Sequence, residues 1–237
     1  LKLKIVREKP VSSNMSALQS GKLRMPTRPG TPSGPIRNIL FDFGSVLVHF
    51  DYDIMFRRFA QKSPLTVLEI RRRLFDNADH RAFERGEIPA PRYYQIVRNQ
   101  IQIRMDYRTF YEAWADIFWP DEAMLDLAER LKKNYQLYLL SNTNEIHYTE
   151  FLRIPRLMKA IPRQGLSFEY GVMKPDPEIY RRFLDEFDLH AGESVLIDDI
   201  LENVQSAREM GMHGIPHRNL KSTCRMLEEM GVLIPGD

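Results

Sequence analysis

Two features are scarce in this 237-residue sequence: there is one cysteine, and no apolar run reaches 18 residues. A single cysteine, Cys224, cannot build a disulfide framework and is typical of a reducing compartment. Without a run of about 18 apolar residues, no segment is predicted to cross a membrane as a helix. The first residues also lack the apolar stretch of a secretory signal. We therefore expect a cytoplasmic protein without a membrane partner.

Acidic residues are nearly absent from residues 1–37, which hold eight basic residues and one acidic residue, a net charge of +7. The other 200 residues carry −5, so the overall +2 hides an acidic body. Residues 10–37 are rich in Pro, Ser, Gly and Thr, and they contain too few large apolar side chains to offset the entropy of ordering. We predict a disordered basic tail over residues 1–37, and nothing in the body suggests a nucleic-acid partner.

Short apolar runs that end in polar residues have the pattern of buried strands. They cover 39–44, 135–140 and 194–197, and a shorter strand is expected near 212–216. Helical patterns lie between and after them, at 121–132, 145–152, 177–187, 201–210 and 219–229, with Pro177 in a first turn and Gly211 after a helix end. Strands that alternate with helices predict a parallel sheet covered on both faces, an α/β fold with a Rossmann-like core.

Residues 52–120 break this alternation. Helical patterns cover about 52–61, 65–75, 91–103 and 107–118, with Ser63 capping the second helix and Pro64 in its first turn, and no strand pattern intervenes. We expect an all-helical cap over 52–120, inserted into a core made of 38–51 and 121–237. An insertion beside the catalytic edge of a sheet can act as a lid.

Acidic residues follow two of the predicted strands. Asp42 ends the first strand, with Gly44 close behind to let the backbone approach an anion, and Asp198-Asp199 ends another. A carboxylate so placed can be a nucleophile that accepts a phosphoryl group. Adjacent carboxylates at ~4 Å repel by about 4 kcal/mol at an effective dielectric of ~20, and Mg²⁺ would offset this with its preference for oxygen ligands. Taken singly, each acid could equally be a turn or helix-capping residue.

Two further polar segments lie at predicted loops of the core. Ser141-Asn142-Thr143 follows the second strand and begins a helix, where a hydroxyl and free N–H groups suit a phosphate oxygen. Lys174 lies in the loop before Pro177 and could balance the charge of a phosphoryl group. Singly these are a plain helix cap and a solvated lysine. Together with the acids they supply the nucleophile, charge neutralisation and metal site that phosphoryl transfer requires.

Four segments carry a resemblance to a known family: 41–47 (FDFGSVL), 140–144 (LSNTN), 171–180 (GVMKPDPEIY) and 197–204 (IDDILENV). They resemble the four motifs of the haloacid dehalogenase (HAD) superfamily over about residues 38–230, and the helical insertion resembles that superfamily's cap. The resemblance implies that Asp42 is the nucleophile, that Ser141 binds phosphate and that Lys174 stabilises the phosphoaspartate.

The same resemblance implies the ligands of the metal and of the phosphate. Mg²⁺ would be held by Asp42, the carbonyl of Gly44, Asp198 and Asp199, with Asn203 orienting the acid pair. The residues expected to contact the phosphoryl group or the substrate are Phe43, Gly44, Ser141, Asn142, Lys174 and Glu84.

One position departs from the superfamily pattern. Its phosphatases usually carry a second Asp, the general acid, two residues after the nucleophile, and here that position is Gly44. Residues 83–88 (FERGEI) resemble bacterial α-D-glucose-1-phosphate phosphatases, relatives of the epoxide hydrolase N-terminal phosphatase domain, and that subgroup shares the glycine. General acid–base help is worth typically 10²–10⁴-fold. Glu84 and His80 are candidate proton donors, a water could replace them, or the leaving group could need no acid.

The function expected is Mg²⁺-dependent hydrolysis of a phosphomonoester through an aspartyl-phosphate, on a small metabolite such as a sugar phosphate, by a monomer or homodimer. A dehalogenase is one alternative, since such enzymes also lack the second Asp of the first motif, but they need no Mg²⁺ and do not keep the acid pair. A non-catalytic phosphate-binding protein is another. The histidines at 147, 190, 213 and 217 show no metal-binding spacing.

Overall fold

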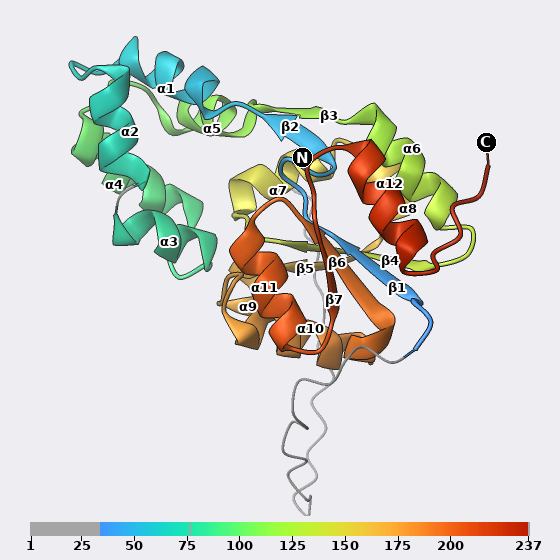
Figure 1. Cartoon of the computed structure of the whole chain (residues 1–237). Coiled ribbons are helices and arrows are strands. Elements are labelled where there is room, and N and C mark those ends of the chain that lie inside the picture. The colour runs from blue at the N-terminus through green and yellow to red at the C-terminus, as the bar shows by residue number, and fades with distance from the viewer. Residues whose placement is uncertain (1–33, 76, 237) are drawn as a thin grey trace, which may run out of the picture.

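A computed structural model describes residues 34–75 and 77–236 (Figure 1). The predicted tail therefore lies outside the described residues, except for its last four. A five-stranded parallel sheet has the order β5-β4-β1-β6-β7. Its strands are β1 (Asn38–Phe41), β4 (Gln136–Ser141), β5 (Arg163–Leu166), β6 (Ser194–Asp198) and β7 (His213–Pro216). The predicted α/β class and parallel core are confirmed, and β5 is an additional edge strand.

Strand residues alternate between the two faces of the sheet. Ile39 is aligned with Leu137 and Val195, and all three pack in one apolar cluster with the helices of one face. Leu40 lies between them in sequence and joins a second cluster on the other face. The helices of the first face are α6 (Glu122–Leu131), α8 (Pro155–Ala160) and α12 (Leu220–Glu229), and those of the second are α10 (Pro177–Glu186) and α11 (Leu201–Glu209). The sheet is thus covered on both sides, as the sequence predicts.

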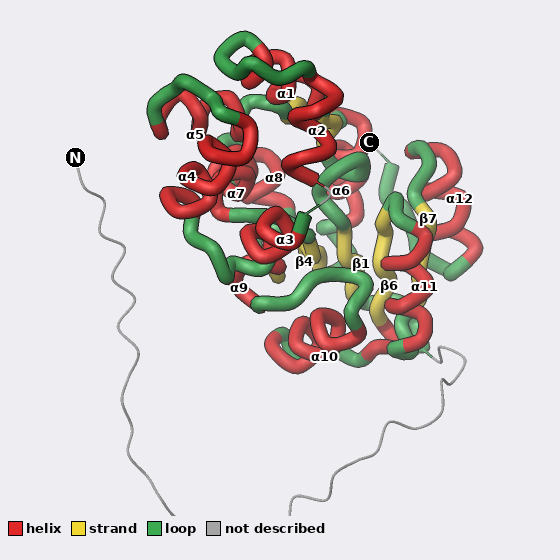
Figure 2. Tube along the Cα trace, turned by 90° about the vertical axis from the view of Figure 1, so that its left-hand side faces the viewer, coloured by secondary structure: helices red, strands yellow, loops and turns green. Residues whose placement is uncertain are grey.

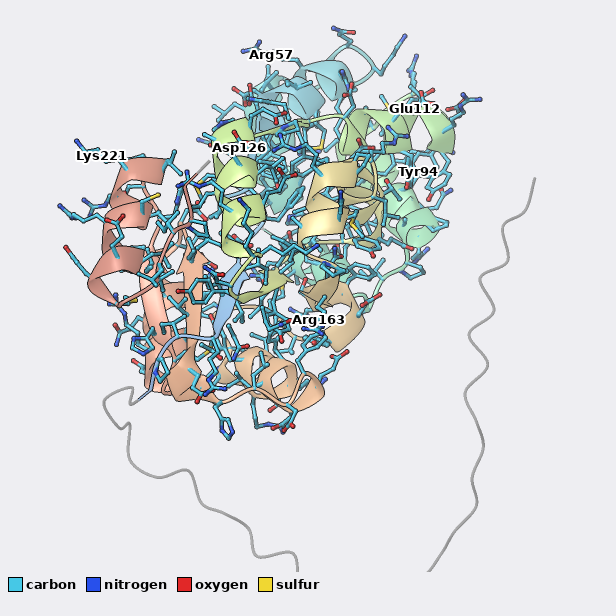
Figure 3. The ribbon with its side chains drawn as sticks, turned by 90° about the vertical axis from the view of Figure 1, so that its right-hand side faces the viewer. Arg57, Tyr94, Glu112, Asp126, Arg163 and Lys221 are labelled. Atoms are coloured by element: carbon cyan, nitrogen blue, oxygen red, sulfur yellow. The ribbon has the colours of Figure 1, made fainter. Side chains whose placement is uncertain are left out.

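Shorter elements complete the core: α7 (Glu145–Phe151), α9 (Ser167–Tyr170) and the 3₁₀ turn η1 (Ala191–Glu193). Several predicted helix ends are confirmed. Asp121 caps α6 by accepting the N–H of Met124, Pro177 is the first residue of α10, and Gly211 follows α11 with φ +84°. Charged side chains such as Arg57, Asp126 and Lys221 lie on the outside of the molecule (Figure 3). Within the described residues, no helix has the length and apolar character of a membrane span.

Five helices form the insertion: α1 (Tyr52–Ala60), α2 (Val67–Phe75), α3 (Ala78–Glu84), α4 (Ala90–Ile101) and α5 (Tyr107–Ala115). They share an apolar cluster of their own, centred on the fully buried Trp114, to which α7 of the core adds only Ile146. Figures 1 and 2 show these helices grouped to one side of the sheet. The sequence did not indicate α3, which has only seven residues.

The expectation that residues 52–120 contain no strand is wrong. β3 (Phe118–Pro120) pairs antiparallel with β2 (Val48–Phe50), His49 opposite Trp119, so that both chain crossings between core and insertion lie side by side (Figure 1). The predicted helix 107–118 ends at Ala115 for the same reason. Aromatic residues such as Phe118 and Trp119 favour extended backbone.

The predicted start of the second insertion helix is also wrong. α2 begins at Val67 because Thr66 and Glu69 form a capping box: the Glu69 carboxylate accepts the N–H of Thr66 at 2.8 Å, and the Thr66 hydroxyl accepts the N–H of Glu69 at 3.3 Å. Ser63 does not cap this helix. Its hydroxyl instead accepts the N–H of Leu65 and donates to the carbonyl of Ile101.

Candidate active site

Lys174 joins the polar ends of three strands. Its ammonium lies 2.9 Å from Oδ1 of Asp42, after β1, and 2.6 Å from Oδ2 of Asp198, at the end of β6. It also donates to the carbonyl of Leu140 in β4 at 2.8 Å. All three ammonium hydrogens thus have acceptors, and the side chain is fully buried. The lysine is therefore fixed in place rather than solvated.

The protonation states of Lys174 and Asp42 depend on each other. Burial disfavours the ammonium of Lys174, but the charges of Asp42 and Asp198 outweigh it and raise its pKa. Burial raises the pKa of Asp42 to about 7, and the charge of Asp198 adds to this rise while Lys174 opposes it. One ammonium therefore does not balance the carboxylates around it.

Three carboxylates share this end of the sheet. One oxygen each from Asp42, Asp198 and Asp199 lies within 4.8 Å of the others. Burial, and then the charge of Asp198, raise the pKa of the half-exposed Asp199. Converging carboxylate oxygens of this kind suit a hard divalent cation.

Asp198 has a different role from its neighbours in this cluster. Its Oδ1 accepts the N–H of Ile200 at 2.9 Å and the amide of Asn203 at 2.9 Å. Its Oδ2 accepts from Lys174 and, at 3.1 Å, from Asn203. Three donor groups thus make four contacts with its two oxygens. Asn203 orients Asp198, and within the described residues it makes no hydrogen bond to Asp199.

Asn142 fixes the loop that carries Lys174. Its side-chain amide donates to the carbonyl of Lys174 at 2.8 Å, and its amide oxygen accepts the N–H of Lys174 at 2.7 Å. The peptide bond from Lys174 to Pro175 is cis. Ser141 is buried nearby, and its hydroxyl has only a 3.4 Å contact with the carbonyl of Asn142, which leaves it open to another partner.

A cavity of about 240 Å³ lies above the carboxylate end, between core and insertion. Nine residues selected from the sequence line it: Asp42, Phe43, Gly44, Glu84, Ser141, Asn142, Lys174, Asp199 and Asn203. Asp198 lies in the carboxylate cluster but not in the lining, and His80 lies behind Glu84. The structure therefore brings the predicted residues to one place.

Aromatic residues form much of the remaining wall, and the sequence did not single them out as site residues. Phe50, Tyr52, Phe118 and Phe151 line the cavity together with Thr143 and His147. The hydroxyl of Thr143 is buried and has no hydrogen-bond partner within the described residues. The one sequence signal for Thr143 was its place directly after Ser141-Asn142.

Phe50 explains why position 44 carries no side chain. A Cβ on Gly44 would lie 2.9 Å from Cε1 of Phe50 and 3.3 Å from its Cδ1. The phenyl ring fills the space that a second carboxyl would need. The glycine at position 44 is thus consistent with the packing of Phe50 against it.

Several contacts hold the insertion against the core, among them the 3.0 Å hydrogen bond from the Tyr111 hydroxyl to that of Thr149. Three others lie around Glu84 and the start of α4. The hydroxyl of Ser167 lies 2.7 Å from the carbonyl of Glu84, and the carboxylate of Glu145 accepts the N–H of Ala90 at the start of α4. Gly86 has φ +69°, and a Cβ there would lie 2.1 Å from the carbonyl oxygen of Phe168. Only glycine fits this approach, so the segment 83–88 serves to seat the insertion on the core.

Known proteins resemble this chain over most of its length. A family model for haloacid dehalogenase-like hydrolases matches residues 36–211. D-ribitol-5-phosphate phosphatase of Bacteroides thetaiotaomicron is 26% identical over 191 residues, which is 78% of this chain and 93% of that protein. A sesquiterpene phosphatase of Aspergillus oryzae is 28% identical over 158 residues, 62% of this chain and 76% of that protein.

Among solved structures, a magnesium complex of the HAD family enzyme bt-2542 from Bacteroides thetaiotaomicron superposes with a TM-score of 0.71. It is 26% identical, and the match covers 78% of this chain and 94% of that one. The match to the family model spans most of the chain and includes every segment that forms the carboxylate cluster. The chain therefore belongs to the haloacid dehalogenase-like hydrolase family.

Proposed function

We propose that this protein is a Mg²⁺-dependent phosphatase that hydrolyses small phosphomonoesters through a phosphoryl group carried on Asp42. The observation that carries the proposal is the placement of Asp42 2.9 Å from the ammonium of Lys174, inside the three-carboxylate cluster and at the floor of the cavity. The named activities of the two relatives, both phosphatases, support it.

The donor set fits magnesium. Asp42 and Asp199 offer carboxylate oxygens, and Mg²⁺ is usually bound by one or two carboxylates together with phosphate and water. We propose these two residues and the carbonyl of Gly44 as direct ligands, with Asp198 contributing charge and orientation because both of its oxygens already accept hydrogen bonds from Lys174, Ile200 and Asn203. When bound, the ion supplies positive charge that offsets the phosphoryl oxygens and keeps Asp42 ionised.

The protein groups divide the remaining work. Asp42 attacks phosphorus. The ammonium of Lys174, which contacts both Asp42 and Asp198, holds these carboxylates in place and balances the charge of the phosphoryl group. The open hydroxyl of Ser141 and the backbone N–H groups of the loop from Phe43 to Gly44 would bind phosphoryl oxygens. Asn142 keeps Lys174 at the right distance through its two hydrogen bonds.

The cavity supports a compact, hydroxylated leaving group such as a sugar or polyol. About 240 Å³ is below the usual 300–1,000 Å³ of ligand pockets, which favours a small substrate over a long isoprenoid chain. The unpaired hydroxyl of Thr143 and the carboxyl of Glu84 face this space with aromatic walls around them. The ribitol phosphate named for one relative has this chemistry.

We also propose that the insertion, residues 52–120, functions as the cap, and that 38–51 with 121–237 forms the catalytic core. The separate apolar cluster of α1 to α5 supports this division. The β2–β3 pair is the junction, since the core contributes β2 and the insertion contributes β3.

A phosphate-release assay over sugar phosphates, polyol phosphates, nucleotides and isoprenoid phosphates, with Mg²⁺ or with EDTA, tests the function. We expect release that requires Mg²⁺ and is highest for a sugar or polyol phosphate. Asp42→Asn should abolish it, whereas Asp116→Asn, an exposed aspartate paired with Arg58, should not. More than a tenth of the wild-type rate in Asp42→Asn would contradict the assignment, and phosphate binding without turnover would favour a non-catalytic protein.

The dehalogenase alternative has a separate test. The acid pair and the converging cluster are features that a metal-independent dehalogenase does not need. Chloride release from 2-chloropropionate in EDTA, with no phosphate release in Mg²⁺, would replace the phosphatase proposal with that alternative.

A further inference from the structure

The cavity has two chemically different ends. Asp42, Lys174 and Asp199 line it from the sheet, and Glu84, the last residue of α3, lines it from the insertion. In phosphoryl transfer the attacking and leaving oxygens lie roughly in line across phosphorus. A leaving oxygen opposite Asp42 therefore points away from the sheet and toward the insertion, where Glu84 is the only cap carboxyl in the lining within the described residues.

Among the described residues, the loop that follows Asp42 (residues 43–47) carries no carboxyl that could protonate that oxygen. Position 44, where family phosphatases were expected to carry a second aspartate, is a glycine whose side-chain space is filled by Phe50. Lys174 has all three hydrogens directed at oxygen acceptors. A proton donor for the leaving group must come from elsewhere in the lining.

Glu84 is held in place from both sides. The hydroxyl of Ser167 contacts its carbonyl at 2.7 Å, and Gly86, two residues on, lies against the backbone of Phe168. Its side chain is 16% exposed, and Nε2 of His80 lies 3.6 Å from its Oε1. Nδ1 of His80 in turn lies 3.1 Å from the hydroxyl of Tyr93. These groups position the carboxyl without taking up both of its oxygens.

The groups around Glu84 differ in the proton they can offer. Burial raises the pKa of Glu84 to about 7, lowers the pKa of His80 to about 4 and lowers that of His147 to about 3. Tyr52 of α1 and Tyr93 of α4 also face Glu84, and burial raises the pKa of both hydroxyls. The two imidazoles are thus neutral near pH 7, and Glu84 is the group that can both give and take a proton there.

We propose that Glu84 is the acid–base residue of the reaction, with His80 as its positioning residue; this rests on the proposed phosphatase function. In the first step a carboxylate oxygen of Asp42 bonds to phosphorus, the ester P–O bond breaks, and the Glu84 carboxyl gives its proton to the departing alkoxide. In the second step the Glu84 carboxylate takes a proton from the water that attacks the acyl phosphate. Phosphate leaves, and Asp42 and the protonated Glu84 are restored.

Leaving-group dependence tests the proposal. p-Nitrophenyl phosphate has a leaving group that departs without protonation. Glycerol phosphate is an alkyl phosphate, and its leaving oxygen needs a proton. In Glu84→Gln, kcat/KM for glycerol phosphate should fall 10²–10⁴-fold, while that for p-nitrophenyl phosphate should stay within about threefold. Glu87→Gln is the matched control, an exposed glutamate on the same segment paired with Arg85, and should change neither value. An equal loss on both substrates, or no loss, would overturn the proposal.

The pH profile of the unmodified enzyme gives a second readout that needs no variant to fold. In saturating Mg²⁺, kcat/KM for glycerol phosphate should fall as the pH rises above about 7, because the protonated carboxyl is lost. p-Nitrophenyl phosphate should not show this limb. His80→Gln should shift the limb without removing it. The same limb on both substrates would contradict the inference.

The two proposals fail in different ways. If wild type releases no phosphate, or Asp42→Asn keeps its activity, the proposed function is wrong and this inference falls with it. If Asp42→Asn is inactive and Glu84→Gln shows no leaving-group selectivity, only the role of Glu84 is wrong.

Discussion

Lys174 is the residue on which the charge balance of the site depends. Its ammonium is the cation shared by two buried carboxylates, those of Asp42 and Asp198. Removing one partner of a buried ion pair typically costs about 3–5 kcal/mol, because the remaining charge is left buried without compensation. The lysine therefore contributes to folding as well as to the proposed chemistry.

Lys174→Met should lower the free energy of unfolding by about 3–5 kcal/mol near neutral pH and abolish turnover. Without the ammonium, burial raises the folded pKa of Asp42 further above its unfolded value of ~3.9. A carboxyl with a raised folded pKa contributes stability below the unfolded pKa and loses it as the pH rises through the folded one. The deficit should thus be smallest near pH 4 and should grow toward pH 8.

Urea unfolding of wild type and Lys174→Met across that range measures this effect. Lys221→Met, which removes an exposed lysine on α12, serves as the control and should follow wild type at every pH (Figure 3). A deficit that shrinks as the pH rises would show that the lysine does not compensate these carboxylates.

Asp198 and Asp199 should respond differently to the same substitution. In wild type, Mg²⁺ at 100 times its Kd should raise the free energy of unfolding by about 2.7 kcal/mol. Asp199→Asn should lose most of this gain with little change in the metal-free protein. Asp198→Asn should be destabilised even without metal, because Lys174 and Asn203 lose their charged acceptor. Thermal denaturation with and without Mg²⁺ separates the two, and equal behaviour would contradict their separate roles.

At this scale the sequence predicts the sheet-end residues well, because a residue that ends a parallel strand must lie at the catalytic edge. Asp42, Ser141 and Asp199 are examples. The burial and raised pKa of Glu84 could not be predicted, since they depend on which way α3 faces. The sequence also could not predict that the Thr143 hydroxyl lacks a hydrogen-bond partner within the described residues, because this depends on tertiary packing.

Among the elements, the strands with continuous apolar runs, β1, β4 and β6, were predicted close to their observed bounds. β5 was not, because Arg163-Gln164-Gly165-Leu166 has no apolar run, and an edge strand buries less of each residue. β2 and β3 have three residues each, too few to show alternation. Short elements held by tertiary pairing are thus the ones that periodicity misses.

α4 begins at Ala90 without a capping side chain of its own, and Glu145 of α7 takes that place from the core. Glu145→Ala should therefore cost about 0.5–2 kcal/mol, as the loss of a helix cap does. Amide hydrogen exchange should speed up in the first turn of α4 more than in β4. Glu112→Ala, at an exposed glutamate of α5, is the control and should leave exchange in α4 unchanged. Unchanged exchange in Glu145→Ala would mean that this contact does not hold α4.

For the whole molecule, Gly86 is a place where the insertion lies tightly against the backbone of the core. Gly86 and Gly171 both have φ +69°, but a Cβ on Gly171 meets nothing within 4 Å. Alanine at either site pays the left-handed penalty of roughly 1–2 kcal/mol. Gly86→Ala should cost more and should also lower phosphatase activity, because the segment carrying Glu84 must shift away from Phe168. Urea unfolding and kcat/KM of the two variants isolate the clash, and equal effects would contradict it.

The sequence predicted two parts, core and insertion, but not how they meet. The contacts that seat one on the other come from residues with no distinctive pattern, such as Ser167 and Glu145. Local patterns describe each part, whereas their mutual orientation depends on surfaces far apart in the chain.

The paired strands β2 and β3 have a consequence for substrate exchange. Both covalent connections between core and insertion run through this one ribbon, so if the other contacts between the two parts were released, the insertion could still turn about β2 and β3. Phe50 lies on β2 and also covers Gly44, two residues from the nucleophile. Such a turn would move the Phe50 ring against the backbone beside Asp42, so the proposed nucleophile would sense the position of the insertion.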